Sequence, residues 1–199
     1  MVDLCRQKPD FLLEGNVRWI GRHKGRGMGR KFHHGPGKLL GTGATLSPVS
    51  CFIFLQGLET LSLRVERHTQ NALKVAEFLN IHPAVAWVRY PDLPGDPENE
   101  RAKKYLPDGS CGVLAFALKG GREVDNRFMD SLKLVTIETH VADCYTCILH
   151  PASHTHRQLT DEQLREAGIA PDLMRLSVGL EDPRDIIADL ERSINEALK

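Results

Sequence analysis

The chain has 199 residues, 41% of them hydrophobic and 26% charged, which fits one globular domain, although two small lobes would also fit. Its 26 basic and 26 acidic residues cancel, and its mostly apolar stretch at residues 49–55 is far too short to span a membrane. The five scattered cysteines do not suggest a disulfide framework, and the first residues lack the pattern of a signal peptide. We therefore expect a cytoplasmic protein with reduced thiols and no membrane partner.

Residues 1–45 differ from the rest of the chain because they are basic and rich in glycine. Residues 1–50 hold nine Lys or Arg against three Asp or Glu, a balance of 9 − 3 = +6, so the remainder carries −6. Such a segment can be a tail that binds phosphate or RNA, or a poorly ordered end. The stretch around Gly25 lacks both common glycine patterns of phosphate loops. We interpret 1–45 as a tail or remnant, expect no nucleic-acid partner, and place a domain over 46–199.

A long helix is predicted at the start of that domain. Ser47 is a favourable N-cap and Pro48 suits the first helical position. Apolar positions then recur every three or four residues as far as Pro83, which predicts one amphipathic helix of more than 30 residues that spans the molecule or links two lobes. Its stripe consists of Phe52, Leu55, Leu58, Leu61, Val65, His68, Ala72, Val75 and Leu79.

Strands and helices alternate after this helix. The apolar runs and turn residues predict strands over 85–90, 112–119, 145–149 and 174–178. Helices are predicted over 99–105 and 121–134, after the capping box that begins at Thr160, and from Asp182 to the C-terminus. The fold class is therefore α/β or α+β, with a small sheet covered by helices on one side.

Arg175 is the first candidate for a functional residue. Alternation along its strand places Leu176 and Val178 on one face and Arg175 with Ser177 on the other. A guanidinium in this position suits bidentate binding of a carboxylate, and it equally suits a structural ion pair with a nearby acid. The residues alone leave both interpretations open.

Two other constellations are weaker. Cys144, Cys147 and the histidines that follow suggest zinc, but a Cys-x-x-Cys on a strand sends its thiols to opposite faces and the usual gap between ligand pairs is missing, so we expect no metal. Ser153 with His154 or His156 and Asp143 suggests a hydrolase, but the chain has no Gly-x-Ser-x-Gly elbow. Core thiols beside a histidine-containing loop are the simpler interpretation.

Several long strings resemble one enzyme family in order and spacing, from about Leu46 to Leu198. The strings are Leu46-Ser-Pro, Leu55-Gln-Gly-Leu-Glu-Thr-Leu-Ser-Leu-Arg-Val-Glu-Arg-His, Asn71-Ala-Leu-Lys-Val-Ala-Glu-Phe-Leu, His150-Pro-Ala-Ser-His-Thr-His and Arg175-Leu-Ser-Val-Gly-Leu-Glu-Asp. In these strings the chain resembles the cystathionine-synthase and O-acetylhomoserine-sulfhydrylase family of pyridoxal-phosphate enzymes.

This resemblance implies the C-terminal small domain of a fold type I enzyme, joined by a long linking helix to a larger cofactor domain. It implies a γ-replacement on O-acetyl-L-homoserine that gives homocysteine or methionine, with pyridoxal phosphate as electron sink. Arg175 matches the arginine that holds the substrate carboxylate, Val141 and Ala142 match the loop near that carboxylate, and Ser153 lies in the motif that lines the substrate pocket. The family gives no catalytic role to His154 or His156.

The departures concern the cofactor. The segment that begins at Asn16 resembles the strand and turn around the Schiff-base lysine, and there Arg18 stands where the family has lysine. An arginine cannot form the imine, and Lys24, six residues on, is the one nearby substitute. We therefore expect a chain that does not turn over alone. The alternatives are an assembly module that docks through the apolar face starting at Phe52, with self-association or pairing with a full-length homologue, and a serine-dependent hydrolase.

Overall fold

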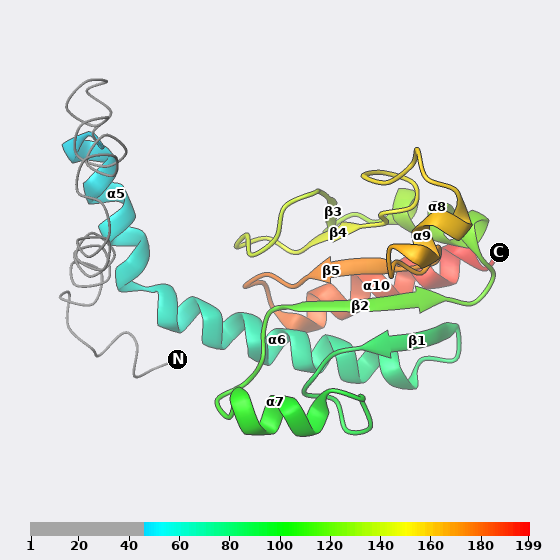
Figure 1. Ribbon diagram of the computed structural model, residues 1–199, viewed down its shortest axis with the longest axis horizontal. Helices are drawn as coiled ribbons and strands as arrows, with labels where there is room; N and C mark the ends of the chain where they lie inside the picture. Colours follow the sequence, from blue (N-terminus) through cyan, green and yellow to red (C-terminus); the bar gives the residue numbers. More distant parts are fainter. Residues whose placement is uncertain (1–45) are drawn as a thin grey trace, which may run out of the picture. The chain divides into compact units, whose positions relative to one another are not determined.

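The computed structural model describes residues 46–199 (Figure 1). The chain divides into two compact units, one that ends at Ser62 and one from Leu63 to Lys199, and each is described by itself. Lys24, Arg18 and the basic segment lie outside the described residues, so the boundary expected near residue 46 stays a prediction. Among the helices that are described, none combines the length and the apolar character needed to cross a membrane.

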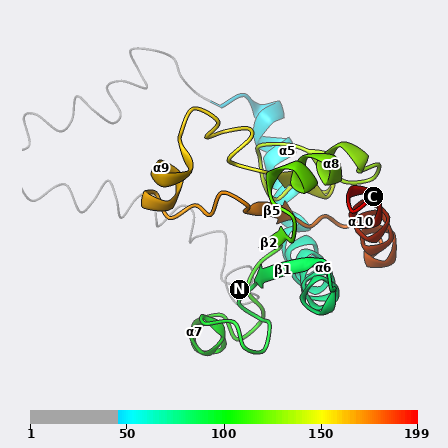
Figure 2. The same ribbon diagram turned by 90° about the vertical axis from the view of Figure 1, so that its right-hand side faces the viewer.

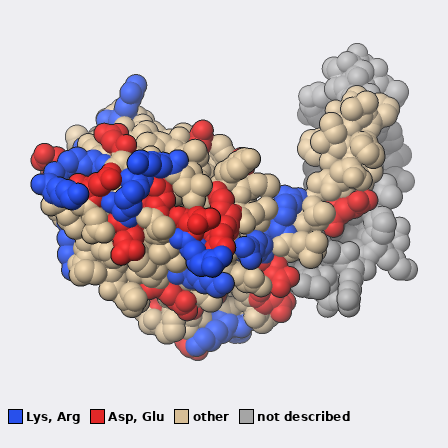
Figure 3. Space-filling view, turned by 180° about the vertical axis from the view of Figure 1, so that it is seen from behind, with Lys and Arg blue, Asp and Glu red and all other residues tan. Residues whose placement is uncertain are grey.

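Helix α5, Pro48–Glu59, begins as predicted: Ser47 Oγ accepts the Ser50 N–H, and Pro48 occupies the first turn. No residue of α5 is buried. Its apolar side chains are exposed by between 47% and 68%, and α5 is almost entirely tan in Figure 3, because it carries few charges. A helix that is apolar on all sides is normally surrounded by other protein. The side chains that have this exposure are Val49, Phe52, Ile53, Phe54, Leu55 and Leu58.

The prediction of one continuous helix was wrong. A second helix, α6, runs over Leu61–Ile81, and Thr60 between the two leaves the helical conformation (φ −105°, ψ 7°). The Thr60 N–H donates to the Leu58 carbonyl instead of the carbonyl four residues back. Glycine at 57 and β-branched threonine at 60 are poor helix formers, and the apolar period continues across them, so periodicity alone could not reveal the break.

The unit Leu63–Lys199 contains a five-stranded sheet in the order β1-β2-β5-β4-β3. Its strands are β1 Val85–Arg89, β2 Val113–Leu118, β3 Thr136–Ile137, β4 Cys147–Leu149 and β5 Met174–Ser177. All neighbours pair antiparallel except β3 and β4, which are parallel. The four predicted strands are confirmed. The third begins late, at Cys147, because the Thr146 N–H donates to the Glu181 carboxylate and not to a strand.

The shorter helices also follow the predictions. They are α7 Asn99–Tyr105, α8 Arg122–Ser131, α9 Asp161–Glu166 and α10 Pro183–Ala197. The capping box at Thr160 is formed in full, and the Asp182 side chain caps α10. Helix α8 stops earlier than predicted because the N–H groups of residues 133–135 all donate to the carboxylate of Asp189 on α10.

Helices α6, α8 and α10 cover one face of the sheet, and Figure 2 shows α6 and α10 on the same side of the strands. The core lies between these layers. Burying each large side chain contributes roughly 1.5–3 kcal/mol, and the strand side chains that face the helices include Leu114, Phe116, Ile148 and Leu176. The predicted α/β class, a small sheet with helices on one side, is confirmed. On the surface seen in Figure 3 this unit mixes positive and negative side chains, as solvated faces do.

Candidate functional site

The other face of the sheet carries the predicted arginine. On β5, Leu176 is buried in the core, whereas Arg175 points to the opposite face, as alternation predicts. Arg175 pairs with Ala115 of β2, which in turn pairs with Arg89 of β1. On its other side Arg175 pairs with Leu149 of β4. Because β5 has a hydrogen-bonded neighbour on each side, the direction of Arg175 is fixed by two ladders.

The Arg175 guanidinium is braced by the loop that precedes β4. Its Nη2 donates to the carbonyl oxygens of Thr139, at 2.7 Å, and His140, at 3.1 Å. Within residues 46–199 its Nε has no hydrogen-bond partner, and Arg175 forms no ion pair. A guanidinium has five N–H donors, so three stay unused after these two bonds. The structural ion pair that the sequence left open is therefore not formed among the described residues.

Val141 and Ala142 lie in the same loop, next to the carbonyls that brace Arg175. Ala142 has φ +65°, the left-handed conformation, and no other described non-glycine residue has a positive φ. Its N–H donates to the Ser177 hydroxyl at 2.9 Å. Val141, 45% exposed, forms no hydrogen bond with any described residue. The structure thus brings Arg175, Val141 and Ala142 together, and it adds Ser177, which the sequence had placed only on the same strand face.

Cys147 lies beneath this loop and is a core thiol. It pairs with Ser177 across the β4–β5 ladder, and its Sγ lies 3.5 Å from the His140 carbonyl. Burial raises the pKa of the Cys147 thiol, while Ser177 and the charge of Arg175 act in the opposite direction. Cys144 is exposed in the loop before β4, so the two thiols do not share a strand as the sequence suggested. Residues 46–199 contain no cluster of three possible metal ligands.

Ser153 lies elsewhere, at the end of β4, and the structure gives it a different histidine from those expected. Its hydroxyl lies 2.8 Å from His150 Nδ1 and 3.3 Å from the Asn126 amide oxygen on α8. The expected partners have other contacts: Asp143 lies 3.2 Å from His140 Nε2, His154 Nδ1 bonds to the His150 carbonyl, and His156 bonds to Thr155. The predicted grouping of Ser153, Asp143 and these histidines is not assembled, and Ser153 has no recorded contact with the Arg175 loop.

His150 is fully buried and faces Asp125 of α8. Its Nε2 lies 3.1 Å from the Pro171 carbonyl and 4.0 Å from Asp125 Oδ2, and both Asp125 oxygens lack a hydrogen-bond partner among the described residues. Burial, reinforced by the charge of Asp172, raises the pKa of Asp125 to about 7, and burial lowers the pKa of His150. Sequence reasoning missed Asp125, since an acid in the first turn of a helix is ordinary.

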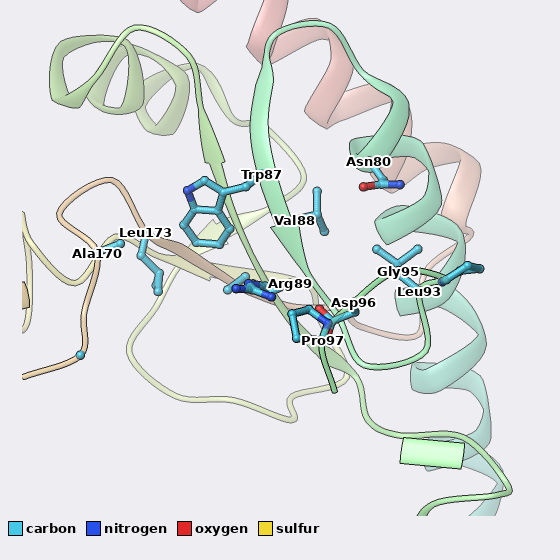
Figure 4. A pocket seen from close by; sticks show the side chains of 13 residues that line it. Asn80, Trp87, Val88, Arg89, Leu93, Gly95, Asp96, Pro97, Ala170 and Leu173 are labelled. Carbon is cyan, nitrogen blue, oxygen red and sulfur yellow. The ribbon is translucent and has the colours of Figure 1, made fainter. Parts of the chain in front are cut away.

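A surface hollow of about 810 Å³ lies beside β1, the edge strand of the sheet (Figure 4). Trp87 and Arg89 line one side of the strand, and Val88 faces Asn80 of α6 on the other. The Trp87 indole N–H donates to Asp172 at 3.4 Å. Arg89 is exposed and forms no ion pair with any described residue. It therefore lies in the same row as Arg175 but lacks the loop that braces Arg175.

The described residues do not fit a cofactor attached through a lysine at this site. Lys119 donates to the Pro83 carbonyl, Lys103 pairs with Glu100, and Lys104 lies over the Tyr105 ring. The remaining described lysines also have no recorded contact with Arg175 or its loop. Residues 46–199 therefore supply a possible anion site but no amine beside it. Lys24, the predicted alternative, lies outside them.

Comparison with known proteins shows which family this chain resembles and how much of a relative's length it covers. The family model for Cys/Met metabolism PLP-dependent enzymes matches residues 24–195. O-acetyl-L-homoserine sulfhydrylase 1 of Thermus thermophilus is 46% identical over 152 residues, which cover 76% of this chain and 36% of the relative. Homocysteine synthase of Schizosaccharomyces pombe is 45% identical over 155 residues, 78% of this chain and 36% of the relative. The chain thus spans about a third of the length of these relatives.

A solved structure agrees with the sequence comparisons. The crystal structure of a protein from Campylobacter jejuni described as an O-acetylhomoserine (thiol)-lyase, which contains a pyridoxyl-lysine, superposes with a TM-score of 0.70 at 43% identity. The match covers 77% of this chain and 37% of that protein. The chain belongs to the family of Cys/Met metabolism PLP-dependent enzymes and corresponds to part of such an enzyme.

Proposed function

We propose that residues 46–199 form the C-terminal, substrate-binding part of an enzyme that carries out γ-replacement on O-acetyl-L-homoserine, to give homocysteine or methionine. One observation carries the proposal: Arg175 is held by two backbone carbonyls and has no acidic partner among the described residues, so its charge and its Nη1 donors are not used by a described side chain. The names of the relatives supply the substrate, because they include O-acetylhomoserine sulfhydrylases and a homocysteine synthase.

The chemistry of Arg175 suits the α-carboxylate of an amino acid. A guanidinium stays protonated at any physiological pH and binds a carboxylate through two parallel hydrogen bonds. Each charge-assisted bond of this kind contributes about 1.5–3 kcal/mol. The Val141 N–H, which has no partner among the described residues, lies in the adjoining loop, but it belongs to the same trans peptide as the His140 carbonyl and points away from the guanidinium. The role of Arg175 is thus to bind and orient the substrate.

We further propose that these residues do not catalyse the replacement alone. The family depends on pyridoxal phosphate, and residues 46–199 place no amine beside Arg175 to hold it. Titration of the purified chain with pyridoxal phosphate, followed by borohydride reduction and peptide mapping, tests this point. We expect no stoichiometric adduct. One adduct on a single lysine, Lys24 above all, would instead assign a cofactor site to this chain.

The carboxylate site has its own test, which needs no cofactor. NMR titration of the chain with O-acetyl-L-homoserine should shift the Arg175 Nε–H and Val141 amide signals. The corresponding amide, which lacks the carboxylate, should leave both signals unchanged. Equal binding of the acid and the amide would overturn the proposal, because binding would then not depend on the carboxylate.

A second candidate function, assembly with another protein chain, is favoured by α5. Its apolar side chains are exposed on all sides, and such a surface is a liability in water unless another chain covers it. We propose that α5 pairs with a second copy or with a full-length homologue in the cytoplasm. Sedimentation velocity should show self-association that Phe52→Lys with Leu55→Lys abolishes.

The matched control for this experiment is Ile81→Lys, which changes an 81%-exposed apolar residue outside α5. Ile81→Lys should leave the association unchanged. A clean monomer of the unaltered chain over a wide concentration range would contradict self-association, and co-purification with a homologue would then be the remaining form of the assembly proposal.

A further inference from the structure

The conformation of Ala142 requires an explanation, because this residue is exposed and yet has a positive φ. A residue with a Cβ in the left-handed region costs about 1 kcal/mol or more relative to an ordinary conformation. Ala142 is exposed, so core packing does not enforce this φ of +65°. Strain of this kind persists only where surrounding contacts maintain it. The recorded contact is the hydrogen bond of 2.9 Å from the Ala142 N–H to the Ser177 hydroxyl.

Ser177 is well suited to hold this loop. It is 2% exposed and lies two residues after Arg175 on the same face of β5. It pairs with Val113 of β2 and Cys147 of β4, so its backbone is fixed from both sides. One strand therefore carries both residues, with their Cα atoms roughly 7 Å apart along the strand.

The loop is attached to β5 at two points, with Val141 between them. Arg175 binds the carbonyls of Thr139 and His140, and Ser177 binds the amide of Ala142. The single residue left between these anchors has the unpaired N–H described above. A separate contact holds the far end of the loop, where Glu181 accepts both the N–H and the hydroxyl of Thr146.

We propose that Ser177 is a positioning residue for ligand binding: by holding Ala142 in the left-handed conformation, it keeps the Thr139 and His140 carbonyls against Arg175 and so holds the guanidinium in one geometry for a carboxylate. This inference rests on the proposed function of Arg175. It differs from a purely structural role, in which Ser177 would only satisfy a buried hydrogen bond. A structural role predicts a loss of stability alone, whereas a positioning role predicts a loss of affinity in the folded chain.

The test compares four proteins by NMR titration with O-acetyl-L-homoserine: the unaltered chain, Ser177→Ala, Ala142→Val, and Ser177→Ala combined with Ala142→Gly. Ser177→Ala should weaken binding about tenfold, since losing one hydrogen bond and the loop geometry is worth about 1.4 kcal/mol. Ala142→Val changes an exposed residue and should weaken binding by a similar factor, because β-branched residues disfavour a positive φ. The combined variant should recover part of the affinity, since glycine adopts this φ without strain.

The outcomes separate the two proposals. No binding by the unaltered chain would overturn the carboxylate site and this inference with it. Binding by Ser177→Ala and Ala142→Val at the affinity of the unaltered chain would overturn the role of Ser177 and leave Arg175 intact. Circular dichroism checks that each variant is folded, and Ala142→Val keeps the test decisive if Ser177→Ala unfolds, because it leaves the buried strand unchanged.

Discussion

The two faces of the sheet are built from the same strands, but one forms the core and the other carries the candidate site. On the covered face, Leu176 and its neighbours are enclosed by α6, α8 and α10 and have almost no exposed surface. On the open face, Arg89, Ala115 and Arg175 lie in one row across β1, β2 and β5, and the two arginines have no acidic partners among the described residues. Adjacent residues of β5 thus belong to the core and to the candidate site in turn.

This contrast teaches that stability and binding can be separated residue by residue. Apolar burial on the covered face holds the fold together, and it also fixes the backbone of β5 from which Arg175 and Ser177 project. The open face also buries Cys147 and Leu149 of β4, but it leaves Arg89 and Arg175 without acidic partners among the described residues. Changes on one face should therefore affect unfolding, and changes on the other should affect ligands.

The largest effect is expected from the covered face. Leu176→Ala should lower the free energy of unfolding by about 3 kcal/mol, because it removes a fully buried side chain and leaves a cavity. Urea denaturation followed by circular dichroism measures this change. Leu176→Met, which conserves volume, should cost less than about 1.5 kcal/mol. A large loss of ligand affinity in the folded fraction of Leu176→Ala would break the separation of the two faces.

Substitutions on the open face should have a smaller effect, and they should lower ligand affinity and not stability. Arg175→Ala should weaken binding of O-acetyl-L-homoserine roughly 100-fold, which corresponds to about 2.7 kcal/mol, and should change stability little. Arg89→Ala is the matched control, because Arg89 lies in the same row but has no loop that braces it. This variant should leave the affinity within twofold. Equal losses in both variants would mean that the row attracts anions by charge alone.

The smallest effect concerns the buried acid on the covered side. Asp125 has a folded pKa of about 7 against an ordinary value of 3.8, so the folded state holds a proton that the unfolded state has lost. Its contribution to stability is therefore complete below pH 3.8 and is lost as pH rises through 7. Relative to Asp125→Asn, which cannot ionise, the unaltered chain should lose about 1 kcal/mol between pH 6.5 and pH 8.

Urea midpoints of both proteins at these two pH values check the expectation for Asp125. Taking the difference between the proteins cancels His150, which is buried neutral and whose effect on stability has the opposite sign. The nearby charged groups Arg122 and Asp172 are present in both proteins and cancel as well. A constant difference between the proteins would show that Asp125 is ionised in the folded state throughout this range.

Rules for helix caps and strand alternation correctly predicted the features that depend on a few neighbouring residues. The cap at Ser47, the capping box at Thr160 and the Arg175–Leu176 alternation each depend on a few neighbouring residues, and all are found in the structure. Strand β3 was missed because two exposed residues, Thr136 and Ile137, give no periodic signal. The order of the strands also had no local signal.

The candidate site divides in the same way. The resemblance to the family indicated Arg175, Val141 and Ala142, and the structure places them together. The hydrogen bond between Ser177 and Ala142 joins residues 35 apart in sequence, and neither residue type predicts this contact. The same holds for Asp125 and His150, which meet only because α8 packs against the sheet near β4. Contacts between distant segments were therefore the part that the sequence could not supply.

The central position of β5 has a consequence for how the protein is made. Strands β2 and β4 leave the ribosome before β5, and each of them needs β5 as a neighbour. Until residues 174–177 emerge, both strands present unpaired backbone edges to other nascent chains, which is the situation that favours aggregation during synthesis. A chain that stops before Met174 would keep those edges permanently, with β1–β2 and β3–β4 as separate pairs. Slow translation near this point would lengthen the exposed interval, and chaperone dependence should rise with it.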